Sequence, residues 1–217
     1  LYDGVFGTLY FLAWTTTPWT LPSNTALAVG PTIRYVKVQS YNPYTAEPLT
    51  VILAKDLLHN YFPKKNEELP MEGYDGNGAD LIGVQYEQLF PWIKPDGDAF
   101  RVIGGDYVTT EDGTGIVHIA PTFGADDDRV AKQSGIPPLV VVDRAGKRQP
   151  MVDRTGKFFL LEDMDSEFVK THVDAAAYKE YAGRFVKNAY DPNLTENDPT
   201  LDIDLCMKFK FENKVFK

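Results

Sequence analysis

Short apolar and β-branched runs recur along most of this chain, and such runs are typical of strands with a buried face. Six segments show the pattern: residues 8–16, 33–39, 50–54, 100–103, 115–119 and 139–142. Clusters of Gly, Pro, Asn and Asp separate them, as expected of turns and irregular links. The pattern therefore predicts a chain that is mostly β.

Helical periodicity is confined to residues 55–61, 126–133 and 166–185. The longest segment places apolar residues three and four positions apart, which predicts one buried stripe, made of Phe168, Val169, Val173, Ala176, Ala177, Tyr181 and Ala182. Residues 73–83, 92–98 and 191–200 have the composition of surface loops. We therefore expect an α+β fold with a β-barrel-like core and peripheral helices.

Composition adds limits to this picture. With 217 residues and 43% hydrophobic content, the chain can bury a substantial core. No apolar run approaches the roughly 18 to 20 residues that span a bilayer. A single cysteine, Cys206, excludes an internal disulfide and fits a reducing compartment. The chain starts at Leu1 rather than at a methionine, so we expect a fragment whose missing targeting signals say little about its parent.

Residues 14–24, WTTTPWTLPSN, carry the strongest chemical signal, with four threonine hydroxyls and two tryptophans. Pro18 lacks a backbone donor and holds Thr17 extended, so a strand should break there. A regular strand would separate Thr16 from Thr15 and Thr17, whereas an irregular break would turn all three hydroxyls toward one cleft. On pattern alone a threonine-rich edge strand is the simpler interpretation; the alternative is a wall for a small polar ligand.

The letters TTTPWTLPSN, followed by ALAV at 26–29, resemble the threonine-rich signature of the editing domain of isoleucyl-tRNA synthetases. The related valine and leucine enzymes carry an arginine where Thr17 stands. A second stretch, GTGIVHIAPTFGADD at 113–127, is similar to the other editing-site strand and helix start of that family. The resemblance implies that residues 1–217 form a single editing domain, excised from a larger cytoplasmic synthetase. The synthetic and anticodon-binding domains would be absent, since no HIGH-like or KMSKS-like motif is present.

Two positions in the second stretch bear on chemistry. Strand alternation turns His118 away from the face of Val117 and Ile119; a structural histidine is the simple interpretation, but the resemblance implies a pocket wall that limits side-chain size. Capping and the helix dipole explain acidic residues at 126–128 in general. The resemblance assigns Asp127 a further role as the partner of the α-ammonium group of an aminoacyl ester.

The chain shows no nucleophile elbow and no Ser/His/Asp order, which disfavours a covalent intermediate. An activated ester can instead be hydrolysed by a positioned water, with hydroxyls and backbone N–H groups steadying the oxyanion and the ribose hydroxyl assisting. The resemblance gives the catalytic residues as Thr15, Thr16, Thr17 and Asp127. It gives the substrate-binding residues as Trp14, Trp19, Thr20, Asn24, His118 and Asp127. We expect no metal and no cofactor, because ATP and Mg²⁺ would belong to the absent synthetic domain.

The implied activity is post-transfer editing, in which valyl-tRNA(Ile) is hydrolysed and isoleucine is excluded by size. A synthetic pocket rejects a side chain that lacks one methylene only weakly, an argument for which this synthetase family is the standard example. The implied partners are the 3′-terminal adenosine of aminoacylated tRNA(Ile), its valine moiety and the rest of the parent synthetase; no membrane is implied. Two alternatives remain: a non-catalytic module that binds an amino acid or the tRNA end, and a metal-assisted hydrolase that uses the acidic triplet.

Charge limits how such a domain can hold tRNA. The formal net charge of −9 argues against a chain that grips nucleic acid by its phosphates, so we expect weak binding by this chain alone. Lysines at 208, 210, 214 and 217 give a local basic stripe. The repeated turns at 143–147 and 153–157, DRAGK and DRTGK, carry further basic residues, although solvated hairpin tips are the commoner reason for such a pattern.

Overall fold

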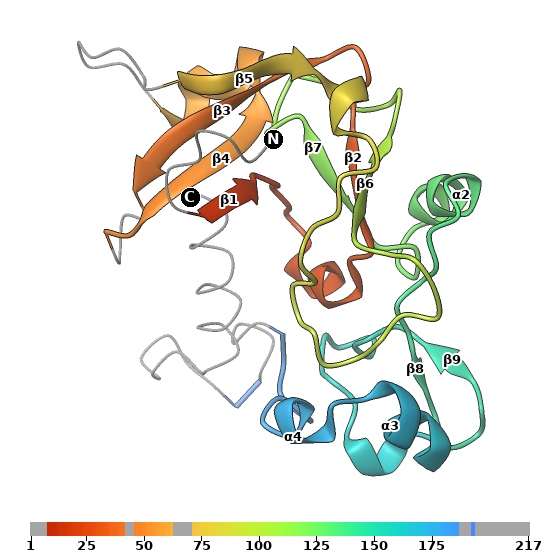
Figure 1. Ribbon diagram of the computed structural model, residues 1–217. Coiled ribbons are helices and arrows are strands. Elements are labelled where there is room, and N and C mark those ends of the chain that lie inside the picture. The colour runs from red at the N-terminus through yellow and green to blue at the C-terminus, as the bar shows by residue number, and fades with distance from the viewer. Residues whose placement is uncertain (1–7, 42–45, 63–70, 187–191, 194–217) are drawn as a thin grey trace.

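The computed structural model describes residues 8–41, 46–62, 71–186 and 192–193 of the chain. Its first sheet has four strands in the order β1 (Thr8–Phe11), β4 (Pro48–Ala54), β3 (Arg34–Tyr41) and β5 (Met71–Asn77) (Figure 1). The β1–β4 pair is parallel, and the other two pairs are antiparallel. Two short helices follow β4, η2 (Lys55–Leu57) and α1 (Leu58–Tyr61).

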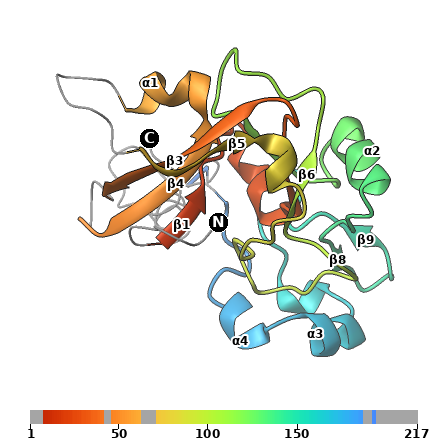
Figure 2. The same ribbon diagram turned by 45° about the horizontal axis from the view of Figure 1, so that its top comes forward.

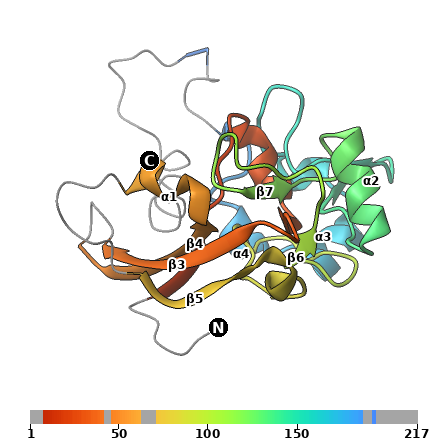
Figure 3. The ribbon, with the colours of Figure 1, turned by 90° about the horizontal axis from the view of Figure 1, so that it is seen from above.

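A second sheet of three strands lies beside the first. Its central strand is β2 (Ala26–Val29), which pairs in parallel with β6 (Arg101–Gly104) and antiparallel with β7 (Ile116–Ile119). Seen from above, β6, β7 and α2 (Ala125–Gln133) lie to one side of the four-stranded sheet (Figure 3). The short helix η3 (Gly78–Leu81) connects β5 to the segment that leads into β6.

Strand β2 joins the two sheets because its alternate side chains serve two cores. Leu27 and Val29 pack with residues of the first sheet, including Tyr35 and Ile52. Ala26 and Ala28 face the other way, into a cluster that contains Val130 and Ala131 of α2. All four β2 residues are buried, so the ALAV segment is apolar throughout rather than alternating.

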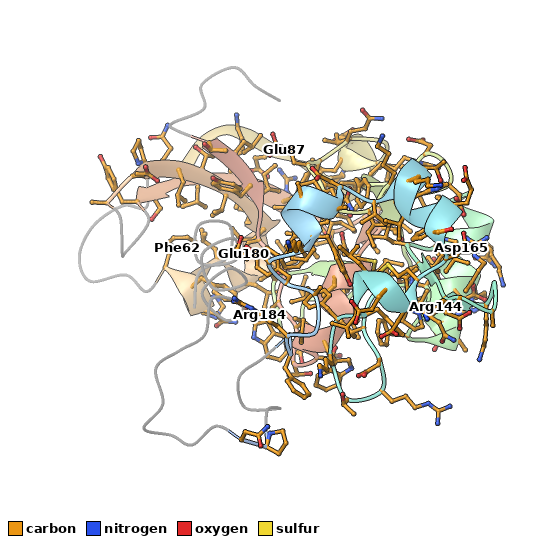
Figure 4. All side chains as sticks on the ribbon, turned by 90° about the horizontal axis from the view of Figure 1, so that it is seen from below. Phe62, Glu87, Arg144, Asp165, Glu180 and Arg184 are labelled. Atoms are coloured by element: carbon orange, nitrogen blue, oxygen red, sulfur yellow. The ribbon has the colours of Figure 1, made fainter. Side chains whose placement is uncertain are left out.

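The elements from residue 141 onward form a lobe below the sheets (Figure 2). It holds β8 (Val141–Val142), β9 (Arg148–Gln149), η4 (Leu161–Asp163), α3 (Ser166–His172) and α4 (Ala175–Tyr178). Figure 4 views this lobe from below, with Asp165 at the start of α3 and Glu180 just beyond α4. Its core centres on Trp92, which stacks on Tyr181 with ring centroids 4.2 Å apart and meets Phe158 and Tyr178 edge-on.

The predicted α+β class is confirmed, and all six predicted strands have a counterpart. Within the described residues the sheets stay separate, of four, three and two strands, and do not close into a barrel. The run at 8–16 is a strand only as far as Phe11, and the run at 139–142 only at its last two residues. In the same part of the chain, no helix is long and apolar enough to cross a bilayer.

Two expectations about secondary structure were wrong. The single helix expected at 166–185 is divided, because residues 172–174 run alongside 92–94 and Asp174 caps a new helix by accepting from the Ala177 N–H. The apolar stripe nevertheless reaches one core, except for the exposed Ala176. The loop expected at 73–83 begins as β5, since β3 gains a backbone partner along that edge.

The two repeated turns fold as the sequence predicts. In each, the Asp Oδ1 accepts from two backbone N–H groups of the turn, those of Ala145 and Lys147 for Asp143 and those of Thr155 and Lys157 for Asp153. The glycine of each turn has positive φ, 76° and 81°. Cys206 and the C-terminal lysines lie outside the described residues, as does all of 191–200 except 192–193.

Candidate functional site

The threonine segment leaves the first sheet after β1 and turns into the 3₁₀ helix η1 (Pro18–Ser23), which Figure 1 draws between β1 and β2. Pro18 stands at the start of η1, where the missing N–H costs nothing. The turn gathers three hydroxyls: Thr15 Oγ1 lies 3.1 Å from Thr17 Oγ1, which lies 3.3 Å from Thr20 Oγ1. The chain of hydroxyls is therefore Thr15–Thr17–Thr20, whereas Thr16 is exposed and lies outside it.

His118 of strand β7 contacts this segment. His118 Nε2 lies 2.9 Å from Thr20 Oγ1. The residue is partly exposed but its Nδ1 is buried, and the desolvation of the ring lowers the pKa of His118 from 6.5 to about 4. The imidazole is therefore neutral at physiological pH, and the polar wall at this point carries no positive charge.

Asp127 lies just beyond, on the first turn of α2. Its Oδ2 accepts a hydrogen bond from the Ala120 N–H at 2.8 Å, which ties the helix start to the end of β7. Desolvation raises the pKa of Asp127, the Ala120 N–H opposes that rise, and Asp126 adds to it. Since the described residues offer the carboxylate this one bond, Oδ1 is the oxygen available to a cationic ligand.

The three acidic residues of the triplet have different partners. Asp126 pairs with Arg129, and Asp128 pairs with Lys132, on the exposed side of α2. Asp127 alone turns inward toward Ala120. Consistent with this divergence, the described residues contain no group of three or more His, Cys, Asp or Glu side chains placed to hold a metal ion.

Asn24 makes hydrogen bonds to the protein with both ends of its amide. It is 3% exposed, and its Nδ2 donates to the carbonyls of Ala26 and Ile119 at 2.9 and 3.5 Å. Its Oδ1 accepts from the Tyr86 hydroxyl at 2.6 Å. With both ends of the amide engaged inside the protein, Asn24 positions the end of η1 against β7.

The two tryptophans of the motif diverge. Trp14 is 50% exposed and lies beside Gly113, with its Cε3 4.0 Å from where a Cβ on that glycine would be. Trp19 packs instead against the core of the C-terminal lobe. Trp14 therefore offers an aromatic surface to the outside, and Trp19 joins the site to the lobe.

The turn before β7 is fastened to the first sheet and its following helices. The Tyr61 hydroxyl donates to the Gly113 carbonyl at 2.9 Å, and the Ala54 N–H donates to the Thr114 carbonyl at 2.9 Å. The buried Tyr35 hydroxyl donates to the Gly115 carbonyl at 2.5 Å. These bonds fix where β7 starts, and with it the position of His118.

Sequence reasoning missed two residues that belong to this region. Tyr86 holds Asn24, yet it lies in an irregular segment without a motif. Tyr107 lies close enough to Asp127 to feel its charge: burial raises the pKa of Tyr107 to about 12, and the Asp127 carboxylate contributes to the rise. No spacing rule connects either tyrosine to its partner, and only the fold brings them together.

Proteins of similar sequence and a structure of similar fold are known. No family model matches the chain. The chain is 60% identical, over 98% of its length, to an isoleucine–tRNA ligase of Bacteroides fragilis, and 56% identical, over 97%, to that of Porphyromonas gingivalis. It spans 20% of the length of each of these relatives. Among solved structures, the P. falciparum cytosolic leucyl-tRNA synthetase editing domain matches with a TM-score of 0.50 and 11% identity, covering 94% of this chain and 76% of that one.

The fold is thus that of an editing domain of an aminoacyl-tRNA synthetase. The two motifs meet in it at the end of β7, where His118 contacts Thr20 and Ala120 contacts Asp127. The chain belongs to the isoleucyl-tRNA synthetase family and corresponds to its editing domain, as the resemblance of its motifs predicts.

Proposed function

We propose that this chain hydrolyses the ester bond of valine-charged isoleucine tRNA and excludes the isoleucine ester by size. One observation carries the proposal. Residues 118–120, at the end of β7, contact two different polar groups: His118 contacts the Thr15–Thr17–Thr20 hydroxyl chain, and the Ala120 N–H donates to the Asp127 carboxylate. A hydroxyl-rich wall suits a water or a ribose hydroxyl. A fixed carboxylate suits an α-ammonium group.

Asp127 is proposed to orient the substrate by its charge. Its Oδ2 is held by the Ala120 N–H, so the remaining oxygen has a fixed direction and needs little reorganisation to accept a cation. Such a charge-assisted hydrogen bond distinguishes an aminoacyl ester from an uncharged acyl ester. The amino group would then place the carbonyl carbon at a set distance from the threonine wall.

His118 is proposed to act by shape and hydrogen bonding rather than as a general base. A base must be near its titration point to exchange protons efficiently, and a pKa of about 4 leaves this imidazole a weak base at neutral pH. The ring is also held against Thr20, so it is a firm limit on the room beside the hydroxyl chain. A rigid wall is what a size filter needs.

The proposed partner is the 3′-terminal adenosine of the tRNA with its aminoacyl group, presented by the rest of the parent synthetase. The chain has a formal net charge of −9, and this acidity is unfavourable for phosphate contacts along a tRNA. We therefore propose that the domain holds only the terminal nucleotide. No cofactor or metal is part of this proposal, and a chelator should leave the activity unchanged.

The test is deacylation of valine-charged against isoleucine-charged isoleucine tRNA by this chain at high concentration. Asp127→Ala should abolish the faster loss of valine. Asp126→Ala is the matched control, because it removes the same charge from the same helical turn but from a side chain that pairs outward with Arg129. If neither ester is hydrolysed faster than in buffer, while the intact parent enzyme is active, the chain is a binding module and the proposal fails. Loss of activity in both variants would remove Asp127 from its proposed role.

A further inference from the structure

The hydrogen positions of the hydroxyl chain follow from one contact. Thr20 Oγ1 lies 2.8 Å from the Thr17 carbonyl oxygen. A carbonyl only accepts, and a threonine hydroxyl has a single proton, so that proton is directed to Thr17. Thr20 Oγ1 is then an acceptor in every other hydrogen bond that it makes.

This assignment fixes the rest of the chain. At the 3.3 Å contact, the Thr17 hydroxyl must donate to Thr20. At the 3.1 Å contact, the Thr15 hydroxyl must then donate to Thr17, while Thr15 Oγ1 itself accepts from the Thr17 N–H at 3.0 Å. All three hydroxyl protons are therefore used inside the segment.

The same assignment fixes His118. Since Thr20 Oγ1 accepts, His118 Nε2 carries the proton in their 2.9 Å hydrogen bond. A neutral imidazole has one N–H, so Nδ1 is a bare acceptor, and it is buried without a hydrogen-bond partner among the described residues. The Thr17 carbonyl, which is two hydrogen bonds away from His118, thus selects the tautomer that is protonated at Nε2.

We infer that the hydroxyl chain presents lone pairs rather than protons to its ligand, and that Thr20 is the positioning residue that sets this polarity together with His118. Thr20 Oγ1 already accepts from Thr17 and from His118 and donates once, so its hydrogen-bonding capacity is full. Thr15 and Thr17 each retain one acceptor position. The group that binds over them must be a donor: a water or a ribose hydroxyl.

This inference rests on the proposed hydrolysis and narrows it. In that reaction the water oxygen bonds to the ester carbonyl carbon, the bond from that carbon to the ribose oxygen breaks, and one water proton ends on the ribose oxygen. Thr15 and Thr17 would accept from the water and so direct its lone pair at the carbon. They do not donate to the oxyanion, contrary to the expectation from the motif alone.

The tautomer is tested directly by two-bond ¹H–¹⁵N correlation spectra of the histidine rings. The chain has three histidines, so the His118 signals can be assigned by their loss in His118→Gln. At neutral pH we expect Nε2 at the shift of a protonated nitrogen and Nδ1 at that of a bare one. A protonated Nδ1, or an imidazolium, would overturn the inference.

Thr20→Ser and Thr20→Val form a matched pair for the kinetic role. Serine keeps the hydroxyl and should keep the tautomer. Valine removes it and should lower the rate at saturating substrate about tenfold, as expected for one lost hydrogen bond, with little change in half-saturating concentration. It should also remove the tautomer preference. An unchanged tautomer in Thr20→Val would contradict the inference.

The two readouts separate this inference from the proposed function. The spectrum needs no turnover, so a chain that hydrolyses no ester can still show the expected tautomer, and then only the proposed function fails. A chain that hydrolyses the valine ester with Nδ1 protonated leaves the function standing and refutes the hydroxyl polarity. Thermal unfolding of each variant identifies any loss that comes from misfolding.

Discussion

Thr20 Oγ1 lies 2.9 Å from His118 Nε2, and this hydrogen bond joins residues 98 positions apart in the chain. It fastens the 3₁₀ helix that follows the first strand to the three-stranded second sheet. Because each residue lies inside one of the two motifs, the contact makes the motifs a single structural unit. A substitution of Thr20 or of His118 should therefore alter the position of the other residue.

Stability should fall on mild acidification because of His118. Its pKa is about 4 in the fold and 6.5 when unperturbed, so between these values the unfolded chain binds the extra proton. The contribution is complete above pH 6.5 and is lost as pH falls through 4, by about 3 kcal/mol in all. Urea unfolding of His118→Gln across this range should lack that loss.

His59→Gln is the control for this experiment, because it makes the same substitution at an exposed histidine. Its stability should follow the pH dependence of the unmodified chain. A His118→Gln profile parallel to that of the unmodified chain would show that His118 titrates normally and is not held neutral by burial.

Asp127→Asn should separate stability from function. The amide can still accept from the Ala120 N–H but carries no buried charge. Since burial raises the pKa of Asp127, the ionised carboxylate costs stability above that pKa, and the cost disappears as pH falls below the ordinary value of 3.8. At pH 7 the variant should melt at the same or a higher temperature while losing deacylation activity. A lower melting temperature would indicate that Asp127 is chiefly a structural capping residue.

Asn24→Ala should destabilise the fold by about 2 to 3 kcal/mol, because it removes the buried hydrogen bonds that Asn24 makes to the Ala26 carbonyl and to the Tyr86 hydroxyl. Tyr86→Phe, which removes only the hydroxyl, should cost about 1 kcal/mol. Urea unfolding of both variants and of the double variant gives their coupling. Additive losses would mean that the 2.6 Å hydrogen bond between them contributes nothing.

Gly115→Ala should be among the most damaging small substitutions. Gly115 has φ of +73°, and a Cβ there would lie 2.4 Å from the Ala54 Cβ. Strain and overlap together predict a loss of about 3 kcal/mol or more. Gly146→Ala is the matched control, since φ is +76° but nothing lies within 4 Å; only the backbone strain of about 1 kcal/mol applies. Equal losses would refute the contact with Ala54.

Local pattern predicted those features of the fold that depend on neighbouring residues. The break at the threonine segment, α2 ending before Gly135 and the two aspartate-capped turns all follow from residues within a few positions of one another. β5 was missed because strand pairing with β3 is a backbone property that its Gly- and Asp-containing sequence does not announce. The division of the helix after His172 depends on residues 92–94, about eighty positions earlier, and so was invisible locally.

The sequence motifs likewise predicted only part of the candidate site. The motifs identified Thr15, Thr17, Thr20, His118 and Asp127, which the fold brings to the two sides of one strand end. They also named Asn24 and Thr16, which the structure places differently: Asn24 is buried in protein contacts and Thr16 is outside the hydroxyl chain. Whether an amide faces a ligand or a carbonyl depends on strand register and packing, which a motif does not encode.

The position of β2 between β6 and β7 also determines when the site can exist. Both partners lie far downstream in sequence, and pairings of such high separation pay their loop-closure entropy before any contact is gained. During synthesis the threonine segment must therefore emerge well before the strand that carries His118. Until β7 docks, the hydroxyls have no ordered opposite wall, so the candidate site forms only once the long-range pairing of β2 with β7 is made.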